Sequence, residues 1–392
     1  MTHVLFVTGE YPPKPGGVGA YTRELAKALR ALDVRITVLT SQHAADRHYL
    51  NNGASLRVLP VIQTWDMGSW RTVSQLAQEL AVDWLHVQYQ TAAYAMHPAI
   101  NFAPRRWRRQ GLRVAWTYHD LLPPYLFPKA GQRFRRWVTE QPARMAHCTI
   151  VTNEGDRQRL AQRSIAALNI PIGSNVAGCR LTPAARVAER AAYGYATKDL
   201  VIAYFGFLNR SKGGLALVRT LQRLVQAGVN AHLLMIGEQV GASDATNFAY
   251  LQEVERLVER SALARRVRWT GNLPDAAVSR ALNAADVLLM PYLDGASLRR
   301  GTLMAGLANG CAIVTTWPQD PLPELVHERD LVYVPAEDDA AMAAAVTRLA
   351  QDAPLRTRLQ SNARDASQQF GWEEIARRHL EIYATGIPRE SA

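Results

Sequence analysis

Two loops of the sequence combine glycine with cationic side chains in a way that suits a phosphate ligand. In FGFLNRSKGG, Gly206 follows an apolar run, and Lys212 opens a glycine-rich helix start with Arg210 beside it. In SLRRGTLMAG, backbone amides around Gly301 and Thr302 begin another helix. Helix starts carry unpaired amides and partial positive charge, so both loops can hold anions. The chemistry that these residues predict is neutralisation of a diphosphate.

A third glycine-rich loop and a histidine stand in the first half of the chain. Gly16 and Gly17 lie in GEYPPKPGGVGAYTREL, where the backbone can approach a ligand at a helix expected to begin near Ala20. His119 and Asp120 end the stretch LRVAWTYHD. A histidine at a strand end can donate to a substrate hydroxyl or carbonyl, and Asp120 can orient it or a loop amide. The competing interpretations are a surface turn and a core histidine.

Short apolar runs alternate with amphipathic stretches along nearly the whole chain. One series includes HVLFVTG, DVRITVLT, DWLHVQ and CTIVTN, and a second begins at LVIAYFG. This alternation predicts an α/β fold of two doubly wound, Rossmann-like domains with parallel sheets. Residues 173–199 lack a strand pattern and are interpreted as the connection between the domains. The terminal segment FGWEEIARRHLEIYATGI could close the second core or return to the first domain.

Positive charge is concentrated in the first half of the chain. The net charge is +11, and residues 101–150 hold ten basic and two acidic side chains. Guanidinium groups pair with phosphate, and tryptophan favours the headgroup region of a membrane. The alternative is a solvated arginine-rich face. An anionic acceptor or membrane surface is expected at Arg105, Arg106, Trp107, Arg108, Arg109, Arg135, Arg136 and Trp137.

The sequence argues against several classes of protein. No run approaches the roughly 18 apolar residues of a spanning helix, and MTHVLF has no basic start, so neither a membrane span nor a signal peptide is expected. Cys148, Cys179 and Cys311 are far apart and odd in number, which argues against disulfides and metal knuckles. No DxD pair occurs. We expect a cytoplasmic protein without metal, cofactor or nucleic acid partner, whose activity survives a chelator.

The loops together resemble the family 4 retaining glycosyltransferases of the group 1 type, which have the GT-B fold. The similar segments are GEYPPKPGGVGAYTRELAKAL, TYHD, GFLNRSKGG, VRWTGNLPDAAVSRALNAADVLLMPYLDG and FGWEEIARRHLEIY, in the family's order over almost the whole chain. The resemblance implies two Rossmann-like domains facing across a cleft, residues 1–176 and 177–372, with residues 373–392 crossing back to the first. It also implies a nucleotide-sugar donor held mainly by the second domain, an acceptor held mainly by the first, and retention without a metal.

Three positions depart from the family pattern. Phe207 stands where the family usually has arginine, and Ser297 and Ala305 stand where it usually has two glutamates. The resemblance assigns the second glutamate to the nucleotide ribose, so its loss predicts weaker donor binding with turnover largely kept. Ala305→Glu is then expected to tighten donor binding if the site has room. The expected donor-binding residues are Gly16, Gly17, Gly206, Ser297, Arg299, Arg300, Gly301 and Thr302.

The leading hypothesis is a retaining glycosyltransferase that moves a sugar from a nucleoside diphosphate sugar to an acceptor hydroxyl. Lys212 and Arg210 would stabilise the departing diphosphate, and His119, beside Asp120, would bind the transferred sugar. The acceptor would be a carbohydrate or lipid-linked, as in polysaccharide biosynthesis, and the enzyme would be peripheral at the inner face of the membrane. Two alternatives stay open: a catalytically impaired scaffold or nucleotide-sugar-binding partner subunit, and an epimerase that uses Asp120 and Glu154.

Overall fold

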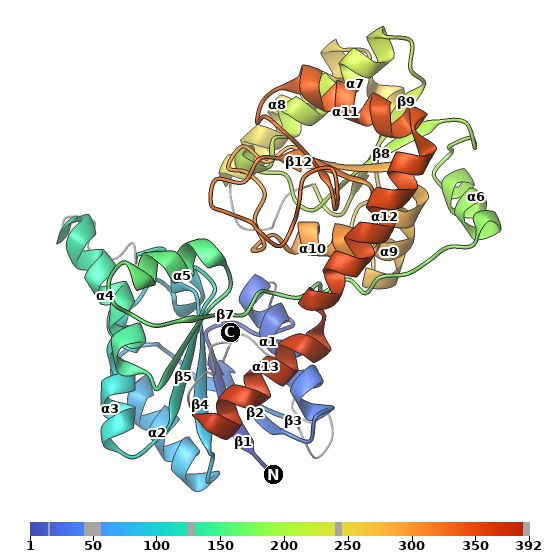
Figure 1. Cartoon of the computed structure of the whole chain (residues 1–392). Coiled ribbons are helices and arrows are strands. Elements are labelled where there is room, and N and C mark those ends of the chain that lie inside the picture. The colour runs from blue at the N-terminus through green and yellow to red at the C-terminus, as the bar shows by residue number, and fades with distance from the viewer. Residues whose placement is uncertain (15, 43–55, 124–129, 240–244, 387–392) are drawn as a thin grey trace. The chain divides into compact units, whose positions relative to one another are not determined.

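The computed structural model describes residues 1–14, 16–42, 56–123, 130–239 and 245–386. The chain divides into two compact units (Figure 1). Unit 1 comprises Met1–Gly173 and Gly371–Ala392, and unit 2 comprises Ser174–Phe370. Each unit is a parallel sheet flanked by helices, which confirms the expected α/β fold with two Rossmann-like sheets.

Unit 1 is built on a seven-stranded parallel sheet in the order β3-β2-β1-β4-β5-β6-β7. Its strands are β1 (His3–Thr8), β2 (Arg35–Ser41), β3 (Leu56–Ile62), β4 (Trp84–Tyr89), β5 (Val114–Tyr118), β6 (Cys148–Val151) and β7 (Leu168–Asn169). The central strands β1, β4 and β5 are buried at every residue, as expected for a sheet covered on both faces. The strand order reverses between β1 and β4, and ligands of such sheets bind at the carboxyl ends beside this reversal.

The helices of unit 1 include one from the far end of the chain. They are α1 (Gly17–Arg30), α2 (Ser69–Glu79), α3 (Ala103–Arg109), α4 (Gly131–Met145), α5 (Glu154–Ala161) and α13 (Trp372–Thr385). Helix α13 contacts α1 and buries Ile375, Ile382 and Tyr383 in the core of unit 1. The indole nitrogen of Trp84 on β4 donates to the Tyr383 carbonyl over 3.0 Å. The C-terminal helix therefore closes the first core, not the second.

Unit 2 is built on a six-stranded parallel sheet in the order β10-β9-β8-β11-β12-β13. Its strands are β8 (Leu200–Phe205), β9 (Ala231–Ile236), β10 (Val267–Trp269), β11 (Val287–Met290), β12 (Ile313–Thr316) and β13 (Val332–Val334). Its helices are α6 (Pro183–Ala192), α7 (Gly214–Gln226), α8 (Ala245–Arg260), α9 (Asp275–Ala284), α10 (Gly301–Ala308), α11 (Asp339–Gln351) and α12 (Ala353–Ser367). The strand order reverses between β8 and β11, so the loops that follow these two strands are neighbours.

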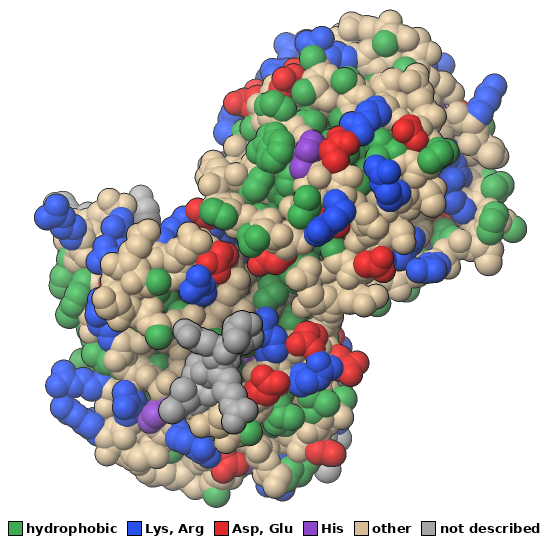
Figure 2. All heavy atoms as spheres, in the orientation of Figure 1, with side chains coloured by type: hydrophobic (Ala, Val, Ile, Leu, Met, Phe, Trp, Pro, Cys, Tyr) green, Lys and Arg blue, Asp and Glu red, His purple; other side chains and the backbone are tan. Residues whose placement is uncertain are grey.

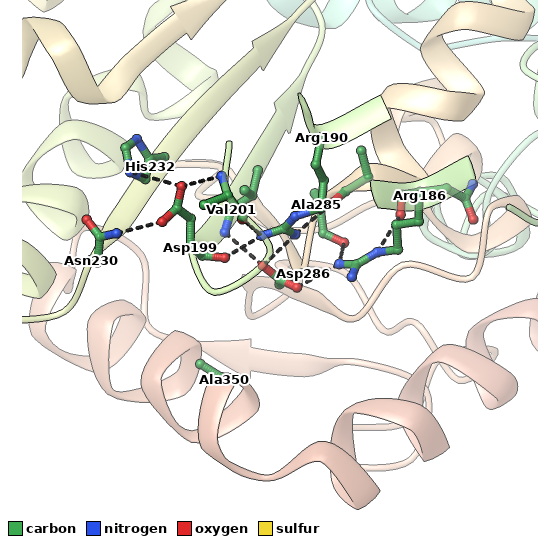
Figure 3. A network of polar contacts seen from close by, with 12 residues as sticks. Arg186, Arg190, Asp199, Val201, Asn230, His232, Ala285, Asp286 and Ala350 are labelled. Carbon is green, nitrogen blue, oxygen red and sulfur yellow. Dashed lines mark hydrogen bonds and ion pairs between the residues drawn. The ribbon is translucent and has the colours of Figure 1, made fainter. Parts of the chain in front are cut away.

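A buried arginine ties helix α6 to this sheet (Figure 3). The Arg190 side chain is 2% exposed and donates to Asp286 over 3.1 Å and to the backbone carbonyl of Asp199. Asp286 also accepts from Arg186 over 2.7 Å and from the Val201 amide over 2.8 Å. A buried guanidinium is tolerated only when paired in this way. Part of the stretch interpreted as a simple connection is therefore a helix that belongs to unit 2.

Candidate active site

The loops after β8 and β11 meet at Gly206. This residue has φ +108°, and a Cβ placed on it would lie 2.8 Å from Thr302 Cγ2 and 3.2 Å from Lys212 Nζ. Only glycine accepts both that backbone conformation and such close neighbours. The sequence motifs GFLNRSKGG and SLRRGTLMAG therefore form one site in unit 2, in which Gly206, Lys212 and Thr302 touch.

Lys212 has a second cation beside it. Burial, followed by the nearby Arg300 guanidinium, lowers the pKa of Lys212 to about 8. Arg300 is itself 17% exposed, pairs with Asp294, and lies with its Cζ 4.2 Å from the Tyr292 ring centroid. Burial disfavours the charged ammonium, the Arg300 charge adds to this, and an anionic ligand beside Lys212 would offset both effects.

Arg210, which was expected to supply the second charge, is held elsewhere. It lies in the short helix η5 (Arg210–Lys212), yet its side chain is 72% exposed and reaches α8. There it pairs with Glu253 over 3.4 Å, and its Cζ lies 5.3 Å from the Tyr250 ring centroid. Of these two arginines, it is therefore Arg300, and not Arg210, whose charge acts on Lys212.

Helix α10 begins without a side-chain cap. Its N-cap residue is Arg300, whose carbonyl accepts from the amides of Leu303 and Met304. Gly301 is exposed, and among the described residues no side chain caps the amides that open this helix. Thr302 Oγ1 lies 2.7 Å from the Tyr292 hydroxyl. Uncapped amides at a helix start that follows Arg300 are able to hold an anion.

Two of the unusual positions in this loop have clear structural roles. Ser297 shapes the turn before α10, since its Oγ accepts from the Arg299 amide over 3.3 Å and its carbonyl accepts from the Arg300 amide. Ala305 has no exposed surface, and Asn309 donates to its carbonyl. A glutamate at position 305 would thus enter packed protein without room. We therefore expect Ala305→Glu to destabilise unit 2 rather than tighten donor binding.

Phe207 leaves an apolar ring at the surface of the site. Its exposed fraction is 45%, and its carbonyl accepts from the Tyr204 hydroxyl over 3.1 Å. A phenylalanine cannot pair with phosphate, so the charge that the family usually places here is absent at this position. In this chain the positive charge that acts on Lys212 is that of Arg300 instead.

The glycine-rich loop of unit 1 differs from the one in unit 2. Helix α1 begins at Gly17, and Glu10 Oε1 accepts from the amides of Val18 over 2.9 Å and Gly19 over 3.2 Å. A Cβ on Gly16 would lie 2.2 Å from the same carboxylate oxygen. Gly16 therefore makes room for Glu10, and the amides expected to meet a ligand are occupied by the chain's own side chain.

His119 follows β5, as expected, and is held in one tautomer. Its Nε2–H donates to Gln88 Oε1 over 3.0 Å, and its ring packs edge-on against Tyr21 with centroids 4.6 Å apart. Burial, followed by the charge of His379, lowers the pKa of His119 to about 3. The imidazole is neutral at physiological pH, and no donor of the described residues pairs with its acceptor Nδ1. A substrate hydroxyl would donate to His119, which reverses the direction expected from the sequence.

Asp120 holds the loop after β5. Its Oδ1 accepts from the Leu122 amide over 3.0 Å, and its Oδ2 accepts from Gln90 Nε2 over 2.9 Å. Asp120 as a whole residue is 6% exposed. Glu154, the other candidate acid, pairs with Arg157 over 2.6 Å. Neither arrangement resembles a free acid–base pair, which removes support from the epimerase hypothesis.

The expected anionic surface of unit 1 is only partly at the surface. Arg105, Arg106, Arg109 and Trp137 line one cavity between α3 and α4. Trp107 was wrongly placed in this set: it has no exposed surface, because α3 turns it into the core, where its Nε1 donates to the Trp70 carbonyl. Other members of the set lie outside the cavity. Arg108 donates to the Met145 carbonyl, Arg136 is exposed and Arg135 is half-buried.

Three contributing residues were missed from the sequence. Glu10 follows β1 by two residues, Gln88 lies near the carboxyl end of β4, and Tyr292 follows β11 by two residues. All three stand at carboxyl ends of strands beside a reversal of strand order, where ligands of such sheets bind. A search for polar side chains at every such strand end would have found them. Among the described residues, no group of three His, Cys, Asp or Glu side chains is arranged to hold a metal.

Two parallel Rossmann-like units with ligand loops at the carboxyl ends of their strands define the GT-B class of glycosyltransferases. Residues 16–172 match the glycosyl transferase 4-like domain, and residues 199–352 match the glycosyl transferases group 1 domain. The chain belongs to the group 1 glycosyltransferase family and is a glycosyltransferase enzyme. It is 24% identical over 381 residues to phosphatidyl-myo-inositol mannosyltransferase of Mycolicibacterium smegmatis, covering 95% of this chain and 90% of that protein.

Solved structures show the same fold. Anabaena HepE in complex with UDP and glucose is 18% identical, with a TM-score of 0.75 over 98% of this chain and all of that chain. Sucrose-phosphate synthase from Thermosynechococcus elongatus is 19% identical, with a TM-score of 0.77 over 98% of each chain. The GT-B fold expected from the sequence motifs is confirmed.

Proposed function

We propose that the enzyme transfers a sugar from a nucleoside diphosphate sugar to a hydroxyl of a lipid-linked or glycan acceptor, with retention at the anomeric carbon. The observation that carries this proposal is the meeting of Lys212, Arg300 and the uncapped start of α10 around Gly206 in unit 2. HepE, a fold neighbour, binds UDP and glucose, which supports a nucleoside diphosphate as the anion.

The two cations and the helix start act on the leaving group. When the bond between the anomeric carbon and the diphosphate oxygen breaks, negative charge grows on the diphosphate, and Lys212, Arg300 and the Gly301 amide stabilise it. The acceptor oxygen bonds to the anomeric carbon on the face that the diphosphate leaves. Its hydroxyl proton passes to the departing phosphate oxygen, which is the base nearest to it when configuration is retained. This scheme requires no metal and no cofactor.

Donor binding in this enzyme depends on phosphate contacts more than on ribose contacts. Ala305 offers no carboxylate to the ribose, and a charge-assisted hydrogen bond of that kind contributes about 1.5–3 kcal/mol. Its loss weakens binding of the ground state while the charges that act on the leaving group remain. We therefore expect a high KM for the donor, ordinary turnover, and weak discrimination among nucleotide bases.

His119 contributes an acceptor from unit 1. Because Gln88 holds its Nε2–H, the neutral Nδ1 accepts a hydrogen bond from a sugar hydroxyl. Asp120 fixes the loop that follows His119 through the Leu122 amide. We assign His119 to substrate positioning, since a neutral imidazole with a pKa of about 3 is a poor proton carrier near pH 7.

The acceptor class follows from the charge of unit 1. Arg105, Arg106 and Arg109 leave a strongly basic surface, and the mycobacterial relative is named for a phosphatidyl-inositol acceptor. We propose an anionic, lipid-linked acceptor and an enzyme that works at the cytoplasmic face of a membrane. Among the described residues, no helix has the length and apolarity to cross a bilayer.

One alternative function, that of a catalytically impaired scaffold subunit, is supported by three residues of the donor loops. Phe207 lacks the charge of the family's arginine, and Ser297 and Ala305 lack both glutamates, as a catalytically impaired scaffold subunit would. Lys212 argues against it, because a lysine whose charged form is disfavoured by burial is costly to keep without a function.

Calorimetric titration separates the two functions. The full-length enzyme is titrated with UDP, GDP, ADP and dTDP, with the Lys212→Ala variant as control. Binding of at least one nucleotide by the wild type, lost in the variant, is expected. Absence of binding of all four at millimolar concentration, with unit 2 still folded by thermal unfolding, would replace the transferase proposal with the scaffold one.

A further inference from the structure

An exposed tryptophan stands at the carboxyl end of β12 in unit 2. Trp317 directly follows this strand and is 50% exposed. Its backbone is fixed, because its amide donates to the Val334 carbonyl on β13 over 3.0 Å. On the face of unit 2 that Figure 2 shows, hydrophobic side chains gather next to a histidine and a group of charged side chains. A large aromatic ring that is held in place and open to solvent can bind the apolar face of a ligand.

Two aromatic rings support the indole of Trp317 from one side. The indole centroid lies 5.0 Å from that of Tyr333 and 4.9 Å from that of His327. The Tyr333 and His327 rings are inclined by only 16°, and their centroids are 6.2 Å apart. If these two rings lay on opposite faces of the indole, their separation would approach the sum of the first two distances. Both therefore lie on the same side of the indole. We call the three residues Trp317, His327 and Tyr333 the Trp317 platform.

Polar groups border the Trp317 platform. Nδ1 of His327 accepts from the Tyr333 amide over 2.9 Å, so the proton of the neutral ring is on Nε2. Glu328 Oε1 lies 3.7 Å from that Nε2 and accepts from Arg348 over 2.6 Å. A pyranose ring has apolar C–H groups on its faces and hydroxyls around its edge, so it binds where an aromatic ring adjoins hydrogen-bonding groups. The platform offers both.

The Trp317 platform is packed against the loop before α10, which also contacts the loop that carries Lys212. The Leu293 amide donates to the carbonyl of Ser211, the residue before Lys212, over 2.8 Å. Two residues later, a Cβ placed on Gly295 would lie 2.5 Å from the Trp317 carbonyl oxygen. Strands β8, β11 and β12 are neighbours in that order, and adjacent strands lie about 4.8 Å apart. The platform is therefore within a few sugar units of the diphosphate site.

Other occupants fit these observations less well. A stable protein interface buries about 800 Å² on each partner, far more than one indole, and a charged pair, Glu328 and Arg348, adjoins the platform. The transferred sugar is bonded to the diphosphate, and the loop before α10 lies between the loops that carry Lys212 and Trp317. An acceptor sugar fits best, because it has to lie beside the reacting centre but outside the diphosphate site.

We propose that the Trp317 platform is a carbohydrate subsite for the acceptor, on which one pyranose ring stacks by its apolar face. The inference rests on the proposed function and narrows its acceptor to a molecule that carries a sugar ring. Rings whose hydroxyls are all equatorial, such as glucopyranose, are favoured, because an axial hydroxyl would lie against the indole. Holding this ring on a fixed strand end orients the acceptor beside the donor loop before transfer.

Saturation-transfer NMR on the full-length enzyme tests the platform. The probes are methyl β-D-glucopyranoside, cellobiose and maltose at millimolar concentration. Transfer to the ring C–H protons of at least one probe is expected, and Trp317→Ala should weaken the affinity read from this signal about tenfold. Trp317→Phe keeps a ring and should lose less, and Phe248→Ala, which removes an exposed aromatic ring elsewhere in unit 2, should change nothing. Absence of transfer to every probe, or equal affinity in wild type and Trp317→Ala, would overturn the proposal.

Further measurements separate the other occupants and a loss of folding. Thermal unfolding checks that Trp317→Ala is folded. If it is not, Trp317→Leu, which keeps apolar bulk without a ring, takes its place, and unchanged sugar affinity in it would equally overturn the proposal. Sedimentation should be the same for wild type and variant, whereas a wild-type dimer that the variant loses would make the platform a protein interface. The sugar signal should persist with UDP-glucose, GDP-mannose, ADP-glucose or dTDP-glucose added. Its loss with a nucleotide sugar, but not with the free nucleoside diphosphate, would assign the platform to the transferred sugar.

Nucleotide titration keeps this inference distinct from the proposed function. Trp317→Ala is expected to bind nucleoside diphosphate as wild type does, because that ligand is held at Gly206 and Lys212. A tenfold loss of nucleotide affinity in this variant would assign the platform to the nucleobase and overturn the proposal. If the wild type binds no nucleotide yet shows the expected pattern of sugar binding, the transferase mechanism fails and the carbohydrate subsite stands. Normal nucleotide binding without sugar binding gives the reverse outcome.

Discussion

Helices α1 and α10 both begin after a glycine-rich loop that follows a strand beside a reversal of strand order, but their first amides have different partners. In α1, Glu10 accepts from the Val18 and Gly19 amides. In α10, no side chain of the described residues caps the start, and the preceding residue is Arg300. The first helix start is closed by an internal anion, and the second is open and follows a cationic residue.

The difference shows that glycine spacing alone does not identify an anion site. Glycine permits close approach, but the approaching group can be the protein's own carboxylate. The sign of the nearest side chain decides the outcome, because a carboxylate at a helix start repels a phosphate and an arginine attracts it. Unit 2 is therefore expected to hold the diphosphate.

Lys212→Ala should have the largest effect of any single change. Removing the ammonium beside the leaving diphosphate is expected to lower kcat/KM by roughly 10²–10³-fold. Folding should hardly change, because burial and Arg300 already disfavour the charged lysine. Transfer assays and thermal unfolding check both statements, with exposed Lys198→Ala as the control. Near-normal transfer by Lys212→Ala would show that the site beside the open helix start does not stabilise the departing diphosphate.

His119→Ala tests the contribution of unit 1. Loss of the Nδ1 acceptor is expected to lower turnover about 100-fold if its hydrogen bond strengthens in the transition state. The Gln88→Ala variant, which frees the ring without deleting it, should lower turnover less. Transfer rates at saturating donor measure both. A His119→Ala enzyme that loses stability but keeps turnover would show His119 to be structural.

Acid should destabilise unit 1 through its buried histidines. Burial lowers the pKa of His86 and His119 below 6.5, and it lowers that of His379 to about 4. At acidic pH the unfolded chain therefore binds more protons than the folded one, so stability falls as pH falls below about 6.5. Thermal unfolding between pH 4 and 8 measures this slope, which His379→Leu should make shallower. A slope unchanged by that exchange would contradict the burial account.

The sequence predicted elements and strand ends better than it predicted side-chain partners. Continuous apolar runs identify buried parallel strands, and strand ends beside an order reversal bring Gly206, Lys212 and Thr302 together. The direction of the Arg210 side chain could not be predicted from the sequence, because it lies over the ring of Tyr250 on α8, which is far from Arg210 along the chain. Trp107 was misplaced for a related reason: a seven-residue helix is too short to show which face is buried.

Arg300→Gln and Arg210→Gln form a matched pair that sharpens the comparison. Both remove one guanidinium near the donor loops, but of the two only Arg300 acts on the charge of Lys212. We expect Arg300→Gln to weaken nucleotide binding about tenfold and Arg210→Gln to weaken it less than about twofold, since a surface ion pair is worth little. Calorimetry with the preferred nucleoside diphosphate gives both values. A larger loss of nucleotide affinity in Arg210→Gln than in Arg300→Gln would show that Arg210 supplies the second positive charge for the diphosphate.

Glu10→Ala is expected to have the smallest effect and tests the closed helix start. Loss of the cap on α1 should lower the free energy of unfolding of unit 1 by about 1 kcal/mol, because two amides lose their acceptor. Glu10→Gln keeps an acceptor oxygen and should cost less. Nucleotide affinity should not change in either variant, since the diphosphate site lies in unit 2. If Glu10→Ala instead tightens nucleotide or phosphate binding in calorimetry, the start of α1 is also an anion site, for which Glu10 competes with the ligand. The two helix starts would then differ only in that Glu10 occupies the first one.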